Sequence, residues 1–193
     1  EWVNKNQIDI VLDEKFLEAV EKANLWPVLV DPTFGTTSVG GSTYAGYTSI
    51  NCSRAASTPE SNGTLTGITM YCKSTSSNLS AALYSDSSGV PSALLAGDDT
   101  GVAIGTDWDW ITCPLSYGSI ATGTQYWLAH KRTSTYGVYY AYDTGDTGEF
   151  KRYTLEAFPA TLGSSIGGTT NRVSIYATYT ASGGTADLTA SAS

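Results

Sequence analysis

The aromatic residues of two short segments are the side chains in this sequence that are best suited to bind a ligand. Residues 108–112 read WDWIT and residues 136–142 read YGVYYAY. Side chains alternate between two faces in an extended chain, so Trp108 and Trp110 share one face, as do Tyr140 and Tyr142. Exposed indole and phenol rings stack on the apolar faces of sugars, while neighbouring polar groups bind the hydroxyls. These four residues are candidates for a sugar-binding platform; the alternative is that the rings fill the core or cover a sheet edge.

A glycine-rich acidic segment is the candidate metal site. Residues 143–149 read DTGDTGE and offer Asp143, Asp146 and Glu149 as hard oxygen ligands for calcium. The spacing is not that of an EF-hand, and a solvated turn is the competing interpretation. Calcium is therefore the one cofactor that the sequence suggests.

Groups for nucleophilic catalysis are sparse. The chain has one histidine, His130, and no G-x-S-x-G motif. Because His130 continues the segment YWLAHKR beside Lys131 and Arg132, we expect it to be exposed at the end of a strand. The acidic residues that could serve glycoside hydrolysis lie in or beside predicted turns, where acids are common for backbone reasons. We therefore expect a protein that is not an enzyme.

The three cysteines, Cys52, Cys72 and Cys113, lack the paired short spacings of a zinc site. Each falls in step with apolar neighbours on a period of two, which predicts that all three point inward. In an oxidising compartment, a cross-strand disulfide could join Cys52 to Cys72 or Cys72 to Cys113. Because the number of cysteines is odd, one thiol would remain unpaired.

Three N-x-S/T sequons begin at Asn51, Asn62 and Asn78, each beside a predicted turn or strand end. Chance alone could supply two or three sequons in a chain so rich in serine and threonine. Their clustering nevertheless agrees with an extracellular protein whose asparagines carry glycans.

Charge and hydropathy narrow the range of partners. The chain has 18 acidic and 10 basic residues, a net charge of -8, which would repel phosphate backbones and anionic membranes. We therefore expect no nucleic-acid partner. No apolar run approaches the roughly 20 residues that span a bilayer, so we expect no membrane insertion.

Residues 1–35 are predicted to form a strand-helix-strand extension. Residues 7–12 (QIDIVL) read as a strand, residues 13–24 (DEKFLEAVEKAN) as a short amphipathic helix, and residues 26–35 (WPVLVDPTFG) as an extended segment. An unpaired strand could add to the sheet edge of a neighbouring copy and so build a filament. The alternative is that the extension packs on its own domain. The candidate contact residues for self-association are Ile8, Ile10, Leu12, Trp26, Val28 and Val30.

Residues 36–180 are predicted to form an all-β antiparallel sandwich of the jelly-roll type. Residues 36–46 read as a linker, and nine strand-like segments joined by polar turns follow. Helical crossovers, which a parallel sheet would need, are lacking in the pattern. Between two of the strands, Asp86 and Gly89 predict a turn, after which residues 91–97 would fold back over the end of the sheet. The small residues of 181–193 predict a flexible C-terminal tail.

Several phrases of this region occur in the order that is typical of a known class of modules. They are ALYSDSSGVPSALLA, WDWITCPL, IATGTQYWLAH and VSIYATYT. Together they resemble jelly-roll modules of large secreted bacterial and archaeal surface proteins, which include carbohydrate-binding modules and anchor-associated domains. The segment WPVLVDPTFG is similar to the YPV-x-x-DPT phrase that commonly precedes such modules. The resemblance covers residues 26–180 and implies a location at the cell surface, without naming a catalytic residue.

These observations lead to two functional expectations. The first is a non-catalytic structural or adhesive module of an extracellular surface assembly or fibre, whose partners are copies of itself or neighbouring surface-protein domains. The second is a carbohydrate-binding module that holds glycans on its aromatic platform.

Overall fold

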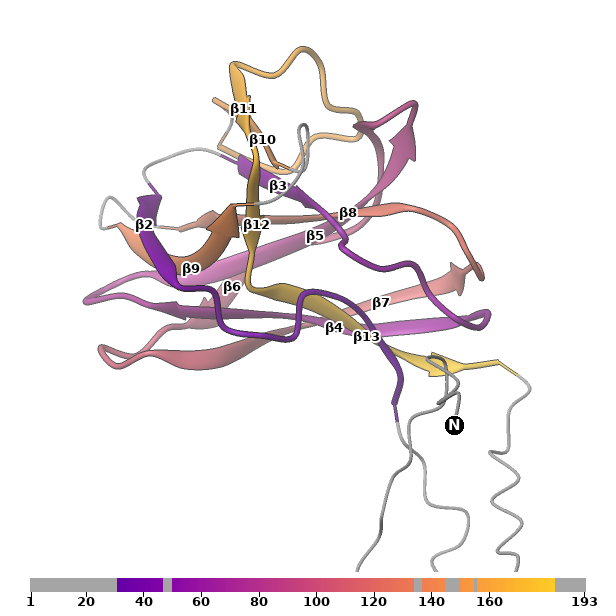
Figure 1. The fold of residues 1–193 in the computed structure, drawn as a ribbon, viewed down its shortest axis with the longest axis horizontal. Helices are drawn as coiled ribbons and strands as arrows, with labels where there is room; N and C mark the ends of the chain where they lie inside the picture. Colours follow the sequence, from indigo (N-terminus) through magenta and orange to yellow (C-terminus); the bar gives the residue numbers. More distant parts are fainter. Residues whose placement is uncertain (1–30, 47–49, 134–136, 145–149, 155, 183–193) are drawn as a thin grey trace, which may run out of the picture. The chain divides into compact units, whose positions relative to one another are not determined.

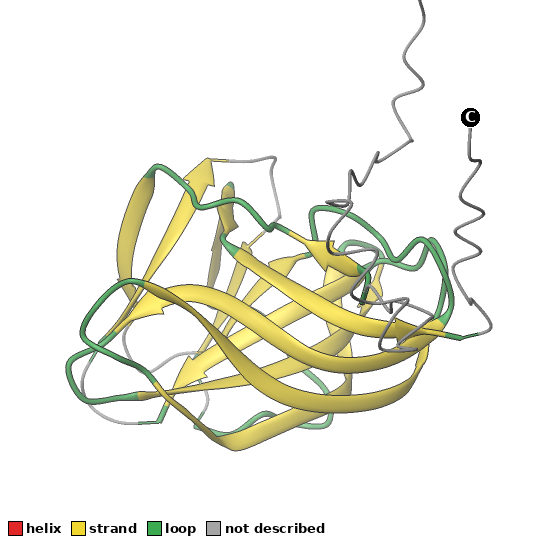
Figure 2. Ribbon diagram, turned by 90° about the horizontal axis from the view of Figure 1, so that it is seen from below, coloured by secondary structure: helices red, strands yellow, loops and turns green. Residues whose placement is uncertain are grey.

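The computed structural model describes residues 31–46, 50–133, 137–144, 150–154 and 156–182. Within them the chain forms thirteen strands in two antiparallel sheets, which confirms the predicted all-β class and agrees with a β-sandwich (Figures 1 and 2). No helix that could cross a membrane occurs among these residues. The predicted strand-helix-strand elements of residues 7–30 and the tail beyond Ser182 lie outside the described residues.

The first sheet has the order β1-β13-β4-β9-β12, with β7 paired to the other edge of β4 and β2 paired to β9. Its strands are β1 (Thr33–Gly35), β2 (Ser42–Gly46), β4 (Gly63–Lys73), β7 (Asp109–Ile120), β9 (Val138–Thr144), β12 (Asn171–Val173) and β13 (Ile175–Ala181).

The second sheet has the order β11-β10-β3-β8-β5-β6. Its strands are β3 (Ile50–Arg54), β5 (Asn78–Ser87), β6 (Val90–Ala103), β8 (Tyr126–Arg132), β10 (Phe150–Tyr153) and β11 (Gly167–Thr169). The chain passes repeatedly from one sheet to the other between β3 and β10, so residues distant in sequence meet in the core.

The main core lies between the two sheets and follows the predicted alternation. Ile68, Met70 and Cys72 of β4 are fully buried, and Leu83 of β5 and Leu128 of β8 belong to the same apolar cluster. Successive side chains of a strand point to opposite faces, so Tyr71 and Lys73 of β4 project from the outer side of the first sheet. The inward-facing residues thereby determine which residues of the same strand meet solvent.

A second apolar cluster covers the outer face of the second sheet. Tyr84 of β5, Trp127 of β8 and Cys52 of β3 pack there, together with Phe158. Residues 156–162, which we call the covering segment, lie over these side chains. Because both of their faces are buried, β5 and β8 do not show the polar alternation expected of strands with one solvated face.

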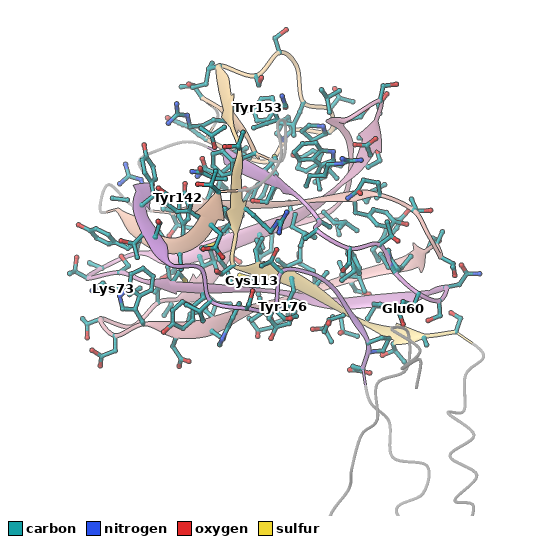
Figure 3. All side chains as sticks on the ribbon, in the orientation of Figure 1. Glu60, Lys73, Cys113, Tyr142, Tyr153 and Tyr176 are labelled. Atoms are coloured by element: carbon teal, nitrogen blue, oxygen red, sulfur yellow. The ribbon has the colours of Figure 1, made fainter. Side chains whose placement is uncertain are left out.

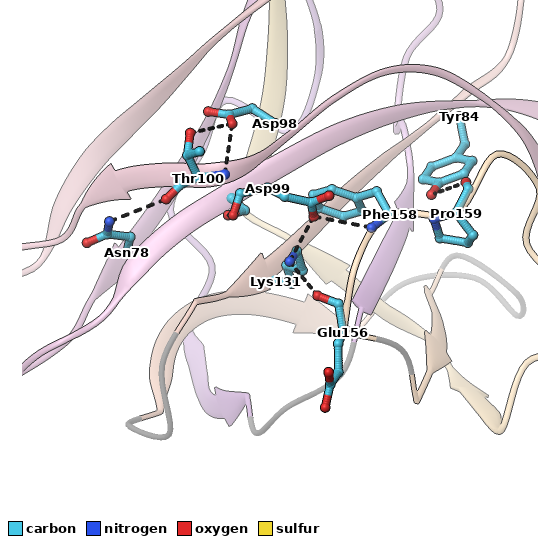
Figure 4. Close-up of polar contacts among 10 residues, drawn as sticks. Asn78, Tyr84, Asp98, Asp99, Thr100, Lys131, Glu156, Phe158 and Pro159 are labelled. Atoms are coloured by element: carbon cyan, nitrogen blue, oxygen red, sulfur yellow. Dashed lines mark hydrogen bonds and ion pairs between the residues drawn. The ribbon is translucent and has the colours of Figure 1, made fainter.

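Hydrogen bonds attach the covering segment to the sheet beneath it. The amide of Leu94 donates to the Ala160 carbonyl at 2.8 Å, and the Tyr84 hydroxyl donates to the Pro159 carbonyl at 3.0 Å. Figure 4 shows the second of these bonds. The covering segment is therefore a packed part of the fold.

The hairpin between β5 and β6 confirms one sequence prediction and corrects another. Ser88 and Gly89 have φ values of 54° and 79°, as a two-residue turn that follows the twist of its strands requires. The Asp86 carboxylate accepts a hydrogen bond from the Gly89 amide at 3.1 Å. Residues 91–97 do not fold back over the sheet, however. They continue into β6, and Asp98 and Asp99 therefore lie in a strand instead of a turn.

The N-terminal boundary of the sandwich also differs from the prediction. β1, which the sequence assigned to the extension, pairs with β13, and its Phe34 is buried in the main core. The segment interpreted as a linker contains β2, which pairs with β9. Glycine and serine residues in 36–46 obscured this strand, because such residues are typical of linkers.

All three cysteines are buried, as predicted, but the predicted disulfide is not formed and the thiols are free. Cys113 lies opposite Ile68, four residues from Cys72 along β4. That is about 13 Å along a strand, whereas bridged Cα atoms lie within roughly 7 Å. Cys52 belongs to the second cluster, on the far face of the second sheet.

Candidate functional site

Four aromatic side chains form a continuous group on the outer face of the first sheet. Tyr71 stacks on Trp108 with centroids 5.5 Å apart and planes inclined by 14°. Trp110 lies 5.2 Å from Tyr71 and 5.2 Å from Tyr176. We call these four residues the aromatic row. Each of them is only partly buried, so the row keeps aromatic surface in contact with solvent.

Strand register explains how residues far apart in sequence form this row. Trp110 of β7 pairs directly with Tyr71 of β4, and Tyr176 of β13 lies opposite Thr69, two residues away on the same face of β4. Trp108 precedes β7 and reaches back over the ring of Tyr71. Three adjacent antiparallel strands therefore bring the rings together, and cross-strand pairs of this kind stabilise a sheet.

A pocket of about 480 Å³ lies at one end of the aromatic row. The Lys73 ammonium stands 5.2 Å from the centroid of the Trp108 ring and 6.0 Å from that of Tyr139, within the range of cation–π attraction. Figure 3 labels Lys73 and Tyr176 on this face of the molecule. The pocket combines ring faces, hydroxyl groups and one positive charge from Thr43, Lys73, Thr75, Thr106, Trp108 and Tyr139.

The predicted platform residues are divided by the structure. Trp108 and Trp110 lie together on the outer face, whereas Tyr140 is 1 % exposed in the main core, between His130 and Phe150. Burial raises the pKa of the Tyr140 hydroxyl. Tyr140 therefore cannot present a ring face to a ligand, which corrects its assignment to the platform. Tyr142 is partly buried and packs against the same core.

The sequence prediction missed four members of the site, of which three left a signal in the local pattern. Tyr71 and Lys73 alternate with Met70 and Cys72, so the period-two pattern of β4 already contained the signal for them. Tyr139 is 41 % exposed, and the same alternation places it opposite Tyr140. The sequence interpretation placed the face of Tyr140 outward, whereas the structure places the face of Tyr139 outward.

Tyr176 could not be found in this way. Alternation within β13 places it outward, but only the pairing of β13 with β4 brings it beside Trp110. Such a pairing depends on the topology of the sheet and leaves no local trace in the sequence.

His130 is buried, which corrects the prediction that it is exposed. It is 2 % exposed and meets the Tyr140 ring edge-on, with centroids 5.0 Å apart. Neither ring nitrogen has a hydrogen-bond partner among the described residues, and burial lowers the pKa of the imidazole to about 3. Its position on the same face as Leu128 places it inside the sandwich, where it cannot reach a ligand at the surface.

The proposed calcium ligands are only partly described. Asp143 is exposed, and its carboxylate accepts a hydrogen bond from the Gly41 amide at 2.8 Å. Asp146 and Glu149 lie outside the described residues. In the part of the chain that the structure describes, no three His, Cys, Asp or Glu residues form a group that could hold a metal ion. The calcium site stays a prediction.

The three sequons lie in different surroundings. Asn51 is 4 % exposed, in the middle of the second sheet between β8 and β10, so the folded protein does not offer it for glycosylation. This corrects its expected place at an accessible turn. Asn78 is partly buried, and its amide donates to the Thr100 carbonyl. Asn62 is exposed, and its side-chain oxygen accepts a hydrogen bond from the Thr122 amide at 2.9 Å.

The residues predicted to mediate self-association all lie in 8–30, outside the described residues, so that role stays a prediction. Comparisons of the chain with models of protein families, with curated proteins and with solved structures find no match.

Proposed function

We propose that the protein is a non-catalytic, carbohydrate-binding adhesive module of an extracellular surface assembly. The observation that carries the proposal is the aromatic row, in which two indoles and two phenols lie in mutual contact on a face that remains open to solvent. Partly exposed aromatic rings suit the apolar faces of sugar rings, and nearby hydroxyl groups suit their polar edges.

The strand order supports assignment of the sandwich to the jelly-roll type. Within the first sheet, β2, β9, β4 and β7 are paired in that order, and within the second sheet β3, β8, β5 and β6 are paired in that order. Two Greek keys in succession generate such a pair of four-stranded sheets. This inference agrees with the resemblance of the sequence to jelly-roll modules of secreted surface proteins, and with a location outside the cell.

Binding without catalysis is favoured by the chemistry of the open face. The histidine that could act as a base is buried away from it. The exposed Asn62 sequon is compatible with an extracellular protein, although it does not require one. A fibre built through residues 8–30 would be compatible with glycan binding, because the aromatic row lies on other strands.

The proposal is tested by retention on insoluble polysaccharides and by affinity electrophoresis in gels that contain soluble ones. Trp110→Ala and Trp108→Ala should each weaken retention about tenfold, because each removes one stacking ring. Tyr44→Ala is the matched control, since it removes a ring that is 40 % exposed but lies outside the row. Circular dichroism must show that each variant is folded. Equal retention of the wild type and both tryptophan variants would overturn the proposal, as would no retention on any polysaccharide.

A further inference from the structure

The geometry points to an acidic sugar as the ligand of the pocket beside the aromatic row. We infer that Lys73 binds the carboxylate or sulfate of one sugar unit there, while neighbouring units of the glycan lie along the row. This inference rests on the proposed function and makes it more specific, because it names the class of glycan.

Lys73 differs from Lys131, a buried lysine of the sandwich, in having no anionic partner in the described part of the chain. Lys131 forms an ion pair with Asp99 at 2.8 Å and donates to the carbonyl of Glu156. Lys73, in contrast, forms no ion pair within the described residues, and the rings of Trp108 and Tyr139 lie near its ammonium. Ring faces attract a cation without neutralising it, so the positive charge stays available for an anion.

The position of Lys73 restricts where such an anion could bind. The alternation of β4 sends Lys73 outward beside Tyr71, and its pairing with Tyr139 of β9 brings it to the wall of the pocket. An anionic group in contact with the ammonium would therefore lie next to Trp108, the ring at that end of the row. A sugar in this pocket could stack on Trp108 and direct its charged substituent to Lys73.

The size and polarity of the pocket suit a sugar unit. Its volume of about 480 Å³ lies within the range of roughly 300–1,000 Å³ that is typical of small-molecule sites. Thr43, Thr75 and Thr106 line it and supply hydroxyl groups that can both donate and accept hydrogen bonds. The ring hydroxyls of a sugar require partners of this kind.

The net charge of -8 does not prevent such binding. At physiological salt, the interactions of exposed charges are screened beyond about 8 Å. The charges near Lys73 therefore decide whether an anion binds there. Asp107 is exposed between the pocket residues Thr106 and Trp108, but it does not line the pocket itself. Asp109 lies opposite Cys72, on the other side of the strand from Trp110. Its carboxylate accepts a hydrogen bond from the Trp110 amide at 2.8 Å and does not line the pocket.

The experiment uses matched acidic and neutral probes in isothermal titration with the full chain. One pair is hexagalacturonate and its methyl-esterified form, and a second is a hyaluronan hexasaccharide and its carboxyl-reduced form. A third pair, a κ-carrageenan hexasaccharide and its desulfated form, separates sulfate from carboxylate. We expect at least one acidic probe to bind about tenfold more tightly than its neutral partner, because a charged group adds a charge-assisted hydrogen bond. The advantage should shrink as salt is raised.

Variants separate this inference from the proposed function. Lys73→Met should abolish the preference for the acidic probe over its neutral partner, whereas Lys73→Arg should keep the preference. Lys151→Met, which removes the same charge from β10 of the second sheet, should leave the preference intact.

Each outcome either supports or overturns the inference. Acidic and neutral probes that bind equally, with Trp110→Ala still harmful, would overturn the acidic subsite and leave the proposed function standing. A preference that survives Lys73→Met, or that is lost equally in Lys151→Met, would also overturn the subsite. A wild-type protein that binds no probe but is retained on neutral polysaccharides would overturn it as well, whereas failure of both assays would overturn both proposals.

Discussion

The outer faces of the two sheets carry similar side chains but meet different surroundings. On the second sheet, Trp127 lies beneath the covering segment, and its indole nitrogen donates to the Asp86 carboxylate at 2.7 Å. On the first sheet, Trp110 lies among other rings of the aromatic row and remains partly exposed. Where an apolar face serves stability, the chain covers it and provides partners for its polar atoms. Rings that stay partly exposed, as in the aromatic row, remain available to a ligand.

Lys131 and Lys73 differ in the same way as the two outer faces. Figure 4 shows Lys131 between the Asp99 carboxylate and the Glu156 carbonyl, close to Phe158 of the covering segment. Lys131 thus links the edge strand β6 to the segment that covers the second sheet. Lys73 touches aromatic rings beside a pocket instead. One lysine is part of the packing, and the other is placed where a ligand could reach it.

The largest expected effect is on stability. Trp127→Ala should lower the free energy of unfolding by about 3–5 kcal/mol, because it leaves a cavity under the covering segment and removes a buried hydrogen bond. Trp110→Ala should lower it less, by about 1–3 kcal/mol, because it removes two ring contacts from a partly exposed site. Urea unfolding followed by far-ultraviolet circular dichroism measures both values. Equal losses in the two variants would remove the distinction between the faces.

The second prediction concerns the pH dependence of the free energy of unfolding, to which the buried His130 contributes. Burial lowers the pKa of His130 from its ordinary value of 6.5 to about 3, so the unfolded chain takes up this proton first as the pH falls. Stability from this group is therefore complete above pH 6.5 and is lost progressively down to about pH 3. The loss should be about 2 kcal/mol between pH 7 and pH 5.

His130→Leu is the test of this pH dependence. Urea unfolding at pH 7 and pH 5 should show a smaller difference in the variant than in the wild type. His130 meets the ring of Tyr140, and its flanking partners in the sheet are Asn51 and Ala81. An unchanged pH dependence would show that His130 is accessible to protons in the folded state.

The third and smaller effect concerns attachment of the covering segment. Asp99→Asn removes the ion pair with the nearly buried Lys131 and should destabilise the protein by about 1–2 kcal/mol, a value reduced because Asp99 is half-exposed. Lys73→Met should change stability by less than about 0.5 kcal/mol. Thermal unfolding of the two variants would compare them directly. A larger loss in Lys73→Met than in Asp99→Asn would mean that Lys73, too, is part of the packing.

Sequence patterns predicted the parts of this molecule that depend on local alternation. Ile68, Met70 and Cys72 were placed in the core correctly, and the turn at Gly89 was located correctly. Trp108 and Trp110 were expected to share one face, and they lie together in the aromatic row. In each of these cases, the cause lies within one strand or one turn.

The errors arose where burial depends on distant segments. β8 was expected to have an exposed end, but sheets and a covering segment enclose it on both faces, which accounts for the burial of His130. The same enclosure hides Asn51 of the neighbouring β3. A continuous apolar run can indicate a strand buried on both sides, yet the polar residues in these strands concealed that pattern. The covering segment has no strand-like signal of its own, so its role could not be read from the sequence.

The smallest effect that we predict tests whether the covering segment opens separately from the main core. Burial raises the pKa of Cys52, and it raises the pKa of Cys72 and Cys113 to about 12, so few thiolates form at neutral pH and labelling requires opening of the structure. Cys52 lies under the covering segment, whereas the other two lie between the sheets.

Native-state alkylation with iodoacetamide, followed by mass spectrometry of peptides, measures the labelling rate of each thiol. In Asp99→Asn, Cys52 should be labelled several-fold faster than in the wild type, while the rates at Cys72 and Cys113 should rise less, because local opening exposes only the second cluster. If all three rates rose equally, the covering segment and the main core would open in a single step. The outer face of the second sheet would then open no more readily than the main core. It would differ from the outer face of the first sheet only in its side chains.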